Sequence, residues 1–452
     1  MGSIRAPPPP ILPGWVARWR RSMPISRRAS PRCRTMPPRS GCTRVQRMPP
    51  EVPPRVILVG DGTAALLAAA ALARMLPPGH LIWLAPLTPP APIDHCARLW
   101  PVAEAFHARI GLRPEALAAA GAHRHSGERF ERWPGPTPWD LPADAELIEQ
   151  PQLDAWLADR RRPLAPAPDP AAPPTRIDPD AYARLLGAHV ARLGVERRAV
   201  PHLGIERRSD GGIARLVADG HGVEADWVVD VSAGLSPAPL RPAPTATGLI
   251  AIGTAPREPQ TRLRAAAFGW IGGGMAGFAP GTDPAAARRR FRTEAAVEPR
   301  AIAPVAQGRR TGWAANVVSL GPAAFVPDPV ARLDLALVQS GLLRLSTMLP
   351  AGAPLGVEIA EANRRGESEH DAAADYARAL TTIDREGAFW TAAAALPVSP
   401  MLARRLDLFA RRGRLPPVED DPVPPGQWRA VLAGLGHAPA RPDPLARAGL
   451  AA

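Results

Sequence analysis

One short turn constrains the fold of this 452-residue chain more than any other feature. The apolar run 56–59 has the composition of a buried strand, and an alanine-rich helical stretch, 63–76, follows closely. Between them lies Gly60-Asp61-Gly62-Thr63-Ala64-Ala65, which has the spacing of a G-x-G-x-x-G/A dinucleotide turn. A second apolar run, 81–84, completes a strand–helix–strand unit. The sequence therefore predicts an α/β fold built on a Rossmann-type core.

Each position of the turn has a physical role in holding a dinucleotide. Gly60 permits the tight turn, and Gly62 lets a pyrophosphate approach the backbone. Thr63 and Ala64 begin the helix, whose free N–H groups and positive dipole end favour phosphate. Ala65 is small enough for close packing of helix on strand. These five residues are the candidate cofactor-binding residues.

Two features weaken this candidate site. No carboxylate occurs between Asp61 and Asp94, so the second strand lacks the acidic residue that holds a ribose hydroxyl. Asp61 also places a negative charge within the turn itself. We therefore expect weak cofactor binding, and the alternative is a Rossmann-like fold that has lost its cofactor.

The charge of the chain is concentrated at its start. The formal net charge is +13, but residues 1–47 contain eleven arginines and no acidic residue. Lysine is absent, because all 55 basic residues are arginine, which excludes a Walker-A lysine and any lysine-centred catalysis. The cysteines, Cys33, Cys42 and Cys96, are too few for a disulfide framework or a Cys₄ zinc site.

Residues 1–50 are rich in Arg and Pro and show no helical or strand period, so we expect them to be disordered. The segment is either an arm for nucleic acid or an acidic membrane surface, or a non-native extension ahead of a start near Met48. The extension is the favoured alternative, and nucleic acid is not the expected partner. The apolar run 56–75 contains Asp61 and Arg74, so it is not a membrane span, and we expect a cytoplasmic protein.

Further elements follow from local patterns. Asp178 and Pro179 are typical of a helix start, and apolar residues continue on one face to Gly194. Strands are expected at 225–231 and 316–320, and helices at 330–349 and 401–410. We expect residues 51–350 to form the cofactor-binding core with an interleaved substrate region. Residues 351–452 should form a helical region.

Several segments, in this order, resemble the flavin-dependent tryptophan halogenases, relatives of the FAD monooxygenases. Besides the turn, they are Ala105-Phe106-His107-Ala108-Arg109-Ile110-Gly111-Leu112, Asp226-Trp227-Val228-Val229-Asp230-Val231-Ser232-Ala233, Asn316-Val317-Val318-Ser319-Leu320-Gly321, Leu337-Val338-Gln339-Ser340-Gly341-Leu342, Ala388-Phe389-Trp390, Gly426-Gln427-Trp428 and Leu435-Gly436-His437-Ala438-Pro439. The resemblance covers roughly residues 55–450. It implies a Rossmann-type, three-layer FAD domain with an interleaved substrate-side sheet and a helical C-terminal part.

The resemblance also implies a chemistry. A separate reductase supplies reduced FAD, which reacts with oxygen, and halide then gives hypohalous acid. A lysine presents the halogen to an indole or another small aromatic substrate, supported by a glutamate. Gly321 would join the turn residues in holding FAD, and no metal is implied.

This chain departs from the family at the residues that carry this chemistry. The family's lysine stretch matches residues 122–130, which places His125 at the lysine position. The supporting glutamate corresponds to Ala331, and the Ser-Thr beside the halide corresponds to Arg332-Leu333. Halogenation by the family's route is therefore not expected.

Two further motifs of the family are altered. Only Trp270 fits its Trp-x-Trp motif, and Phe325 replaces the second glycine of a flavin-proximal Gly-x-x-x-Gly. Trp270, Trp390 and Trp428 suit core packing better than stacking on a substrate. Arg332 is either an anion-binding residue, a plug in the halide pocket or a solvated helix residue.

His123, Arg124, His125 and Glu128 form a compact ionisable cluster in the matched substrate region. His125 is the candidate catalytic residue, because an imidazole can act as a general base. The alternative is a polar surface loop, and the spacing is not that of a metal site. The expected function is a FAD-dependent oxidoreductase acting on an indole or similar aromatic, and the alternative is a non-catalytic binding or assembly partner.

Overall fold

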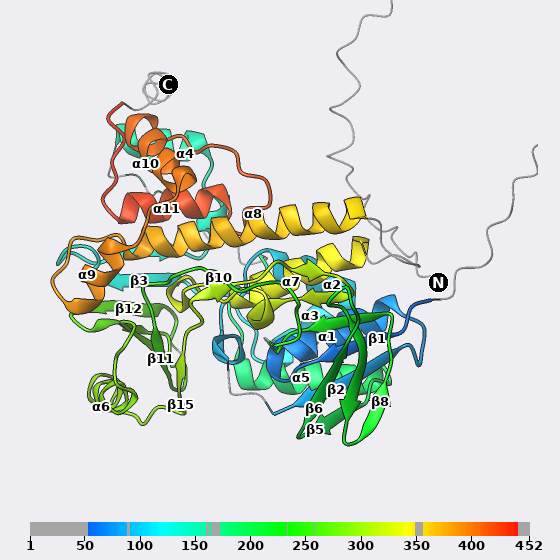
Figure 1. The fold of residues 1–452 in the computed structure, drawn as a ribbon. Helices are drawn as coiled ribbons and strands as arrows, with labels where there is room; N and C mark the ends of the chain where they lie inside the picture. The colour runs from blue at the N-terminus through cyan, green and yellow to red at the C-terminus, as the bar shows by residue number, and fades with distance from the viewer. Residues whose placement is uncertain are drawn as a thin grey trace, which may run out of the picture. The chain divides into compact units, whose positions relative to one another are not determined.

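Figure 1 shows the protein as a computed structural model. The structure describes residues 53–441 except 88–90, 160–161, 163, 165–171, 233, 257 and 349–355. The chain divides into residues 1–50 and 51–452, and the second unit is described by itself. The predicted disorder of residues 1–50 lies outside the described residues.

A largely parallel sheet forms the Rossmann-type core, with the strand order β17-β18-β9-β1-β2-β5. Its strands are β1 (Val56–Val59), β2 (Leu81–Pro86), β5 (Arg197–Val200), β9 (Trp227–Asp230), β17 (Trp313–Ala314) and β18 (Val317–Ser319). Neighbouring strands run parallel except β17, which is antiparallel to β18. The predicted strand–helix–strand unit and both later strands are confirmed.

Layers on both faces of this sheet bury its apolar side chains. Because successive residues of a strand point to opposite faces, Val56 and Leu58 pack on one side and Ile57 and Val59 on the other. The helical layer contains α1 (Gly62–Met75), α5 (Pro179–Arg192) and α7 (Asp334–Met348). The opposite layer is an antiparallel sheet of β6 (Leu203–Arg207), β7 (Ile213–Ala218) and β8 (His221–Val223).

Helix α5 begins where local chemistry predicts. The Asp178 carboxylate accepts a 2.8 Å hydrogen bond from the Ala181 N–H, so Asp178 caps α5 as expected. Helix α1 carries a run of buried alanines, and it packs against α5 and α7. The small side chains of these alanines let α5 and α7 approach α1 closely.

A second sheet has the order β15-β11-β14-β13-β12-β3-β4. Its strands are β3 (Gly127–Glu131), β4 (Trp139–Pro142), β11 (Leu249–Ile252), β12 (Thr261–Ala266), β13 (Gly269–Gly272), β14 (Met275–Phe278) and β15 (Ala301–Pro304), and α6 (Pro284–Ala295) packs against β11 and β15. β3 and β4 precede β5 in the chain, whereas β11 to β15 follow β9. The two sheets are therefore interleaved in sequence, as predicted.

Shorter elements connect the two sheets. They are η1 (Pro92–His95), α2 (Val102–Ile110), α3 (Pro114–Ala119), η2 (Ala145–Leu147), α4 (Gln150–Ala158), the β10–β16 pair (Arg241–Pro242 and Gly308–Arg309), η3 (Gly321–Ala323) and η4 (Pro329–Ala331). The long helix predicted from residue 330 thus begins only at Asp334. A separate 3₁₀ turn precedes it, and Arg332 between the two has a left-handed φ of 53°.

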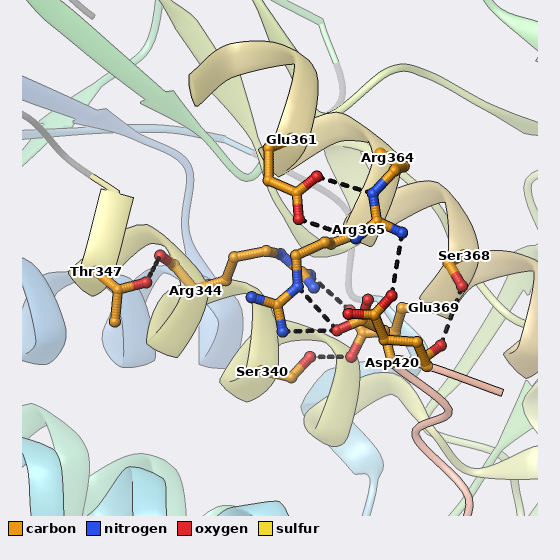
Figure 2. A network of polar contacts seen from close by, with 10 residues as sticks. Ser340, Arg344, Thr347, Glu361, Arg364, Arg365, Ser368, Glu369 and Asp420 are labelled. Atoms are coloured by element: carbon orange, nitrogen blue, oxygen red, sulfur yellow. Dashed lines mark hydrogen bonds and ion pairs between the residues drawn. The ribbon is translucent and has the colours of Figure 1, made fainter. Parts of the chain in front are cut away.

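The C-terminal region is helical, with α8 (Gly356–Thr381), α9 (Ala388–Ala395), α10 (Pro400–Arg412) and α11 (Pro425–Gly434). α8 crosses the unit and packs against α7, α9, α10 and α11 (Figure 1). Figure 2 shows the polar contacts that fix it: Glu369 accepts hydrogen bonds from Ser340 and Arg344 of α7, and Arg365 pairs with Asp420. No helix within the described residues is both long and apolar enough to span a membrane.

Candidate functional site

The glycine turn has the predicted backbone but is closely packed by the chain itself. Gly60 and Gly62 have φ values of +140° and +73°, which favour glycine. A Cβ added at Gly60 would lie 2.3 Å from the Val231 Cγ2 atom, and one at Gly62 would lie 2.5 Å from the Asp94 Oδ1 atom. The glycines are therefore needed where β9 ends and where the Asp94 side chain approaches.

Asp94, in η1, lies at the N-terminus of α1. The Thr63 N–H donates a 2.7 Å hydrogen bond to Asp94 Oδ1, and the Ala91 N–H donates a 2.9 Å bond to Asp94 Oδ2. A helix N-terminus attracts an anion through its unpaired N–H groups and its dipole. Here the Asp94 carboxylate of the same chain is that anion. No carboxylate lies between Asp61 and Asp94 in the sequence, and no local pattern predicted that Asp94 itself reaches this helix end.

Other carboxylates add negative charge near the same helix end. Asp61 forms an ion pair with Arg197, and hydrogen bonds from Arg197 and the Gly62 N–H outweigh burial and lower the Asp61 pKa. The expectation that Asp61 carries an unpaired charge is therefore wrong. Asp334 is buried at the start of α7, where burial, and then the charges of Asp328 and Asp94, raise its pKa to about 7.

The remaining candidate residues of the turn lie inside the core. Thr63, Ala64 and Ala65 are buried. Gly321 has a φ of +53°, and a Cβ added to it would lie 3.9 Å from the Ala64 Cβ, so the two residues are neighbours. Gly321 lines a cavity of only about 50 Å³. The structure thus brings Gly321 and the turn together, as expected, without a large cavity at Gly321.

A much larger cavity, of about 820 Å³, lies beside α2, α3, β3 and β12. Apolar parts of its wall include Leu112, Leu117, Leu141 and Met275, together with the ring of Trp100. Neither cavity is lined by any of the turn residues 60–65. Because cavities of this size hold small organic molecules, this is the candidate ligand site.

A buried ion cluster lines the large cavity. Glu128, which is 6% exposed, accepts from Arg98 Nη1 at 2.9 Å and from Arg332 Nη1 at 3.0 Å, both through its Oε1 atom. Burial alone would raise the pKa of Glu128, but the two guanidinium groups hold it below its usual value. The interpretation of Arg332 as a solvated helix residue is wrong, because Arg332 is 6% exposed and lines this cavity.

His125 lines the same cavity, next to this cluster. Its Nε2 atom lies 2.9 Å from Thr261 Oγ1 and 3.1 Å from the Thr261 backbone nitrogen. Burial, followed by the positive charge of Arg176, lowers the pKa of His125 to about 4. His125 is therefore neutral near pH 7 and a weak base, and its ring nitrogens face groups of the chain.

The other members of the predicted cluster separate. His123 and Arg124 line the cavity, but Arg124 pairs with Asp144 rather than with Glu128. All four residues therefore line the cavity, but they do not form one connected group. Glu128 pairs with Arg98 and Arg332, which come from distant parts of the sequence.

The tryptophans divide as the sequence indicates, with one addition. Trp270, Trp390 and Trp428 are at most 1% exposed and belong to the core. Trp100, which sequence reasoning missed, lies in the cavity wall, with the Arg98 guanidinium 4.0 Å from its ring centroid. No local pattern marks Trp100, because its indole N–H donates to the Arg332 carbonyl, which is 232 positions away in the sequence.

The residues that replace other family positions are also packed inside. Ala331 and Leu333 are at most 2% exposed, so neither brings a polar group to the cavity. Phe325 packs its ring against His370, with 5.0 Å between the ring centroids. These positions therefore provide apolar packing rather than chemistry.

Comparison with known proteins finds a family that matches part of the chain. Residues 257–449 match the model of the tryptophan halogenases. This matched segment is less than half of the chain, and it resembles that family. No curated protein sequence matches the chain.

Solved structures of this family have the same fold. BrvH, a flavin-dependent halogenase from Brevundimonas sp. BAL3, is 24% identical, with a TM-score of 0.73 over 88% of this chain and 93% of that one. Xcc4156, a flavin-dependent halogenase from Xanthomonas campestris, is 22% identical, with a TM-score of 0.73 over 88% and 92%. SttH, a tryptophan 6-halogenase from Streptomyces toxytricini, is 19% identical, with a TM-score of 0.72 over 87% and 92%. These likenesses confirm the predicted α/β fold.

The match to the tryptophan halogenases implies FAD, and the turn can be tested for its fit. The Thr63 N–H, the donor that a pyrophosphate would use, is already bonded to Asp94. A Cβ-sized group above Gly62 would already meet the Asp94 carboxylate, so the approach to the backbone is filled. As folded, the turn does not fit a pyrophosphate. FAD binding by residues 60–65 and Gly321 stays a prediction, and it requires Asp94 to move.

Proposed function

We propose that this protein is a ligand-binding member of the tryptophan halogenase family that does not halogenate its ligand. The ligand is a small aromatic molecule held in the large cavity. The observation that carries the proposal is the contact between Asp94 and α1. Because the chain's own carboxylate takes the N–H that a flavin pyrophosphate needs, tight FAD binding is disfavoured.

The chemistry of the cavity supports this proposal. The chain has no lysine anywhere, so no amine side chain is present to carry a halogen. His125, at the family's lysine position, has a pKa of about 4, far from the value that suits a general base near pH 7. Glu128 is already engaged by Arg98 and Arg332. Glu128, Arg98 and Arg332 therefore form ion pairs with one another and are not free acids or bases.

The shape of the cavity supports an aromatic ligand. Its volume of about 820 Å³ is within the range of small-molecule sites. Leu112, Leu117, Leu141 and Met275 offer apolar contacts, and Trp100 offers an aromatic face. An indole ring is therefore a suitable probe.

The test measures flavin and indole binding on the same preparation. We expect purified protein without a flavin absorbance band, weak binding in a FAD titration, and saturable binding of indole in calorimetry. Stoichiometric FAD in the purified protein, together with halogenated product from an added aromatic, would overturn the proposal. Absence of any indole binding would overturn the proposal that the cavity holds an aromatic ligand.

A second candidate is a FAD-dependent oxidoreductase acting on an indole or similar aromatic, supplied with reduced flavin by a separate reductase. The observation that favours it is the positive φ at Gly60 and Gly62, which keeps the backbone of a dinucleotide turn. Oxygen consumption with a flavin reductase and excess FAD separates the candidates. Consumption above that of the reductase alone, dependent on the aromatic compound, supports the oxidoreductase.

A further inference from the structure

Three arginines from separate chain segments, Arg98, Arg176 and Arg332, lie around Glu128 in the wall of the large cavity. Arg176 and Arg332 are buried, and Arg98 is half-buried. Glu128 bridges Arg98 and Arg332, and it uses the same Oε1 atom for both. One buried carboxylate therefore pairs with two of the three guanidinium groups.

Arg332 is the least satisfied of the three. Only its Nη1 atom reaches Glu128, and its buried Nε and Nη2 atoms have no acceptor among the described residues. Gly273 lies beside it, since a Cβ added there would be 3.1 Å from Arg332 Nη2. A buried guanidinium with unused donors is costly, and an external oxyanion would offset that cost.

Arg176 adds a charge that Glu128 does not neutralise. Its Nη1 atom donates to Thr261 Oγ1, and its Nη2 atom donates to the Pro256 carbonyl at 3.1 Å, so both recorded partners are uncharged. Burial, and then the charge of Arg332, lower the pKa of Arg176.

Other carboxylates line the cavity without taking the free donors of Arg332. Glu104 and Glu146 are in the cavity wall, but among the described residues neither forms an ion pair with Arg176 or Arg332, and Arg124 is paired with Asp144. His125 is neutral near pH 7 and contributes no charge. The Nε and Nη2 donors of Arg332 therefore stay open to an external anion.

We propose that Arg98, Arg176 and Arg332 form an oxyanion subsite that binds the carboxylate of an aromatic acid in this cavity. The inference rests on the proposed function in one respect, that the cavity takes a small aromatic ligand. A carboxylate suits the subsite, because a guanidinium binds it through a planar pair of hydrogen bonds. Arg98 covers the Trp100 ring, and the attached ring would contact the apolar side chains that line the cavity.

The first experiment needs no substitution. Indole-3-acetate and the neutral indole-3-acetamide are titrated into the full chain, and binding is followed by calorimetry. We expect the acid to bind at least about tenfold more tightly, which is the scale of one charge-assisted hydrogen bond. Equal binding of acid and amide would overturn the oxyanion subsite and leave the proposed function standing. If neither compound nor indole binds, the proposed function itself fails.

Two substitutions test the subsite in opposite directions. Arg98→Gln removes a guanidinium and should weaken binding of the acid about tenfold, with little effect on the amide. Glu128→Gln removes the competing carboxylate and should tighten binding of the acid. If the cluster has only a structural role, both substitutions should weaken binding of the acid and of the amide to the same extent, and this result would refute the proposal.

Controls exclude trivial causes. Arg411→Gln removes an exposed arginine on α10 that pairs with Asp407, and it should bind both compounds like the parent. Inorganic phosphate is added as a competitor: displacement of indole-3-acetate but not of the amide supports an oxyanion subsite. Displacement of both compounds alike argues against it.

Discussion

Replacing Asp94 with alanine should open the N-terminus of α1 to flavin. The Thr63 N–H donates to Asp94 Oδ1 at 2.7 Å, a hydrogen bond to a charged group that contributes about 1.5–3 kcal/mol. The favourable position of the carboxylate at the helix end contributes about 0.3–1 kcal/mol more. FAD binding to the parent must displace the Asp94 carboxylate and lose both contributions, whereas Asp94→Ala has neither to lose. Since Asp94 is half-buried, we take the lower end, about 2 kcal/mol, which corresponds to about 30-fold tighter binding.

The assay is a titration of FAD into the parent and the variant, followed by the quenching of flavin fluorescence. Asp94→Asn keeps an acceptor for the Thr63 N–H but removes the charge, so its affinity should lie between the two. Asp407→Ala, which removes an exposed carboxylate of α10, is the matched control and should bind FAD like the parent. Without FAD, Asp94→Ala should unfold more easily, because α1 loses its capping contact. Equal FAD affinity in the parent and Asp94→Ala would refute the reasoning.

Three further outcomes follow from the described contacts. The pKa of Asp334 in the folded protein, about 7, is above its ordinary value of 3.8, so the free energy of unfolding should fall as the pH rises from about 4 to 7. Asp334→Asn should abolish this fall. In thermal melts at pH 5 and pH 8, the variant should be more stable than the parent at pH 8, by at most about 4 kcal/mol. Glu369→Gln leaves the half-buried Arg344 without a charged partner and should lower the free energy of unfolding in urea by about 1.5–3 kcal/mol, whereas no loss would refute the structural role of this pair. With reduced FAD, oxygen, bromide and tryptophan, neither the parent nor His125→Ala should give a halotryptophan by mass spectrometry, and a regioselective product from the parent alone would make His125 catalytic.

Local sequence patterns predicted the elements of this fold because those elements depend on neighbouring residues. The apolar run of β1 matches the prediction at both ends, and the Asp178 cap of α5 follows from residues only three apart. The boundary of α7 was less accurate, because the 3₁₀ turn of η4 and the left-handed Arg332 interrupt an apolar stretch that has no glycine or proline to mark the break.

The site was less predictable because its contacts join distant residues. Asp94 meets Thr63 across 31 positions, Arg197 meets Asp61 across 136, and Arg332 meets Glu128 across 204. No periodicity or turn rule reports such pairs. The sequence indicated the residue types near the cavity, but only the packed structure reveals which charges are paired and which are in excess.

The strand order of the parallel sheet has a consequence for synthesis of the chain. β18 covers the outer edge of β9, yet Val317 follows Asp230 by 87 positions. At a translation rate of about 5–20 residues per second, the edge of β9 that will pair with β18 stays unpaired for ~4–17 s. An apolar strand, Trp227-Val228-Val229, is then an open edge that invites pairing with other nascent chains. Truncated forms ending before residue 317 should therefore aggregate, and rapid overexpression should favour inclusion bodies over folded protein.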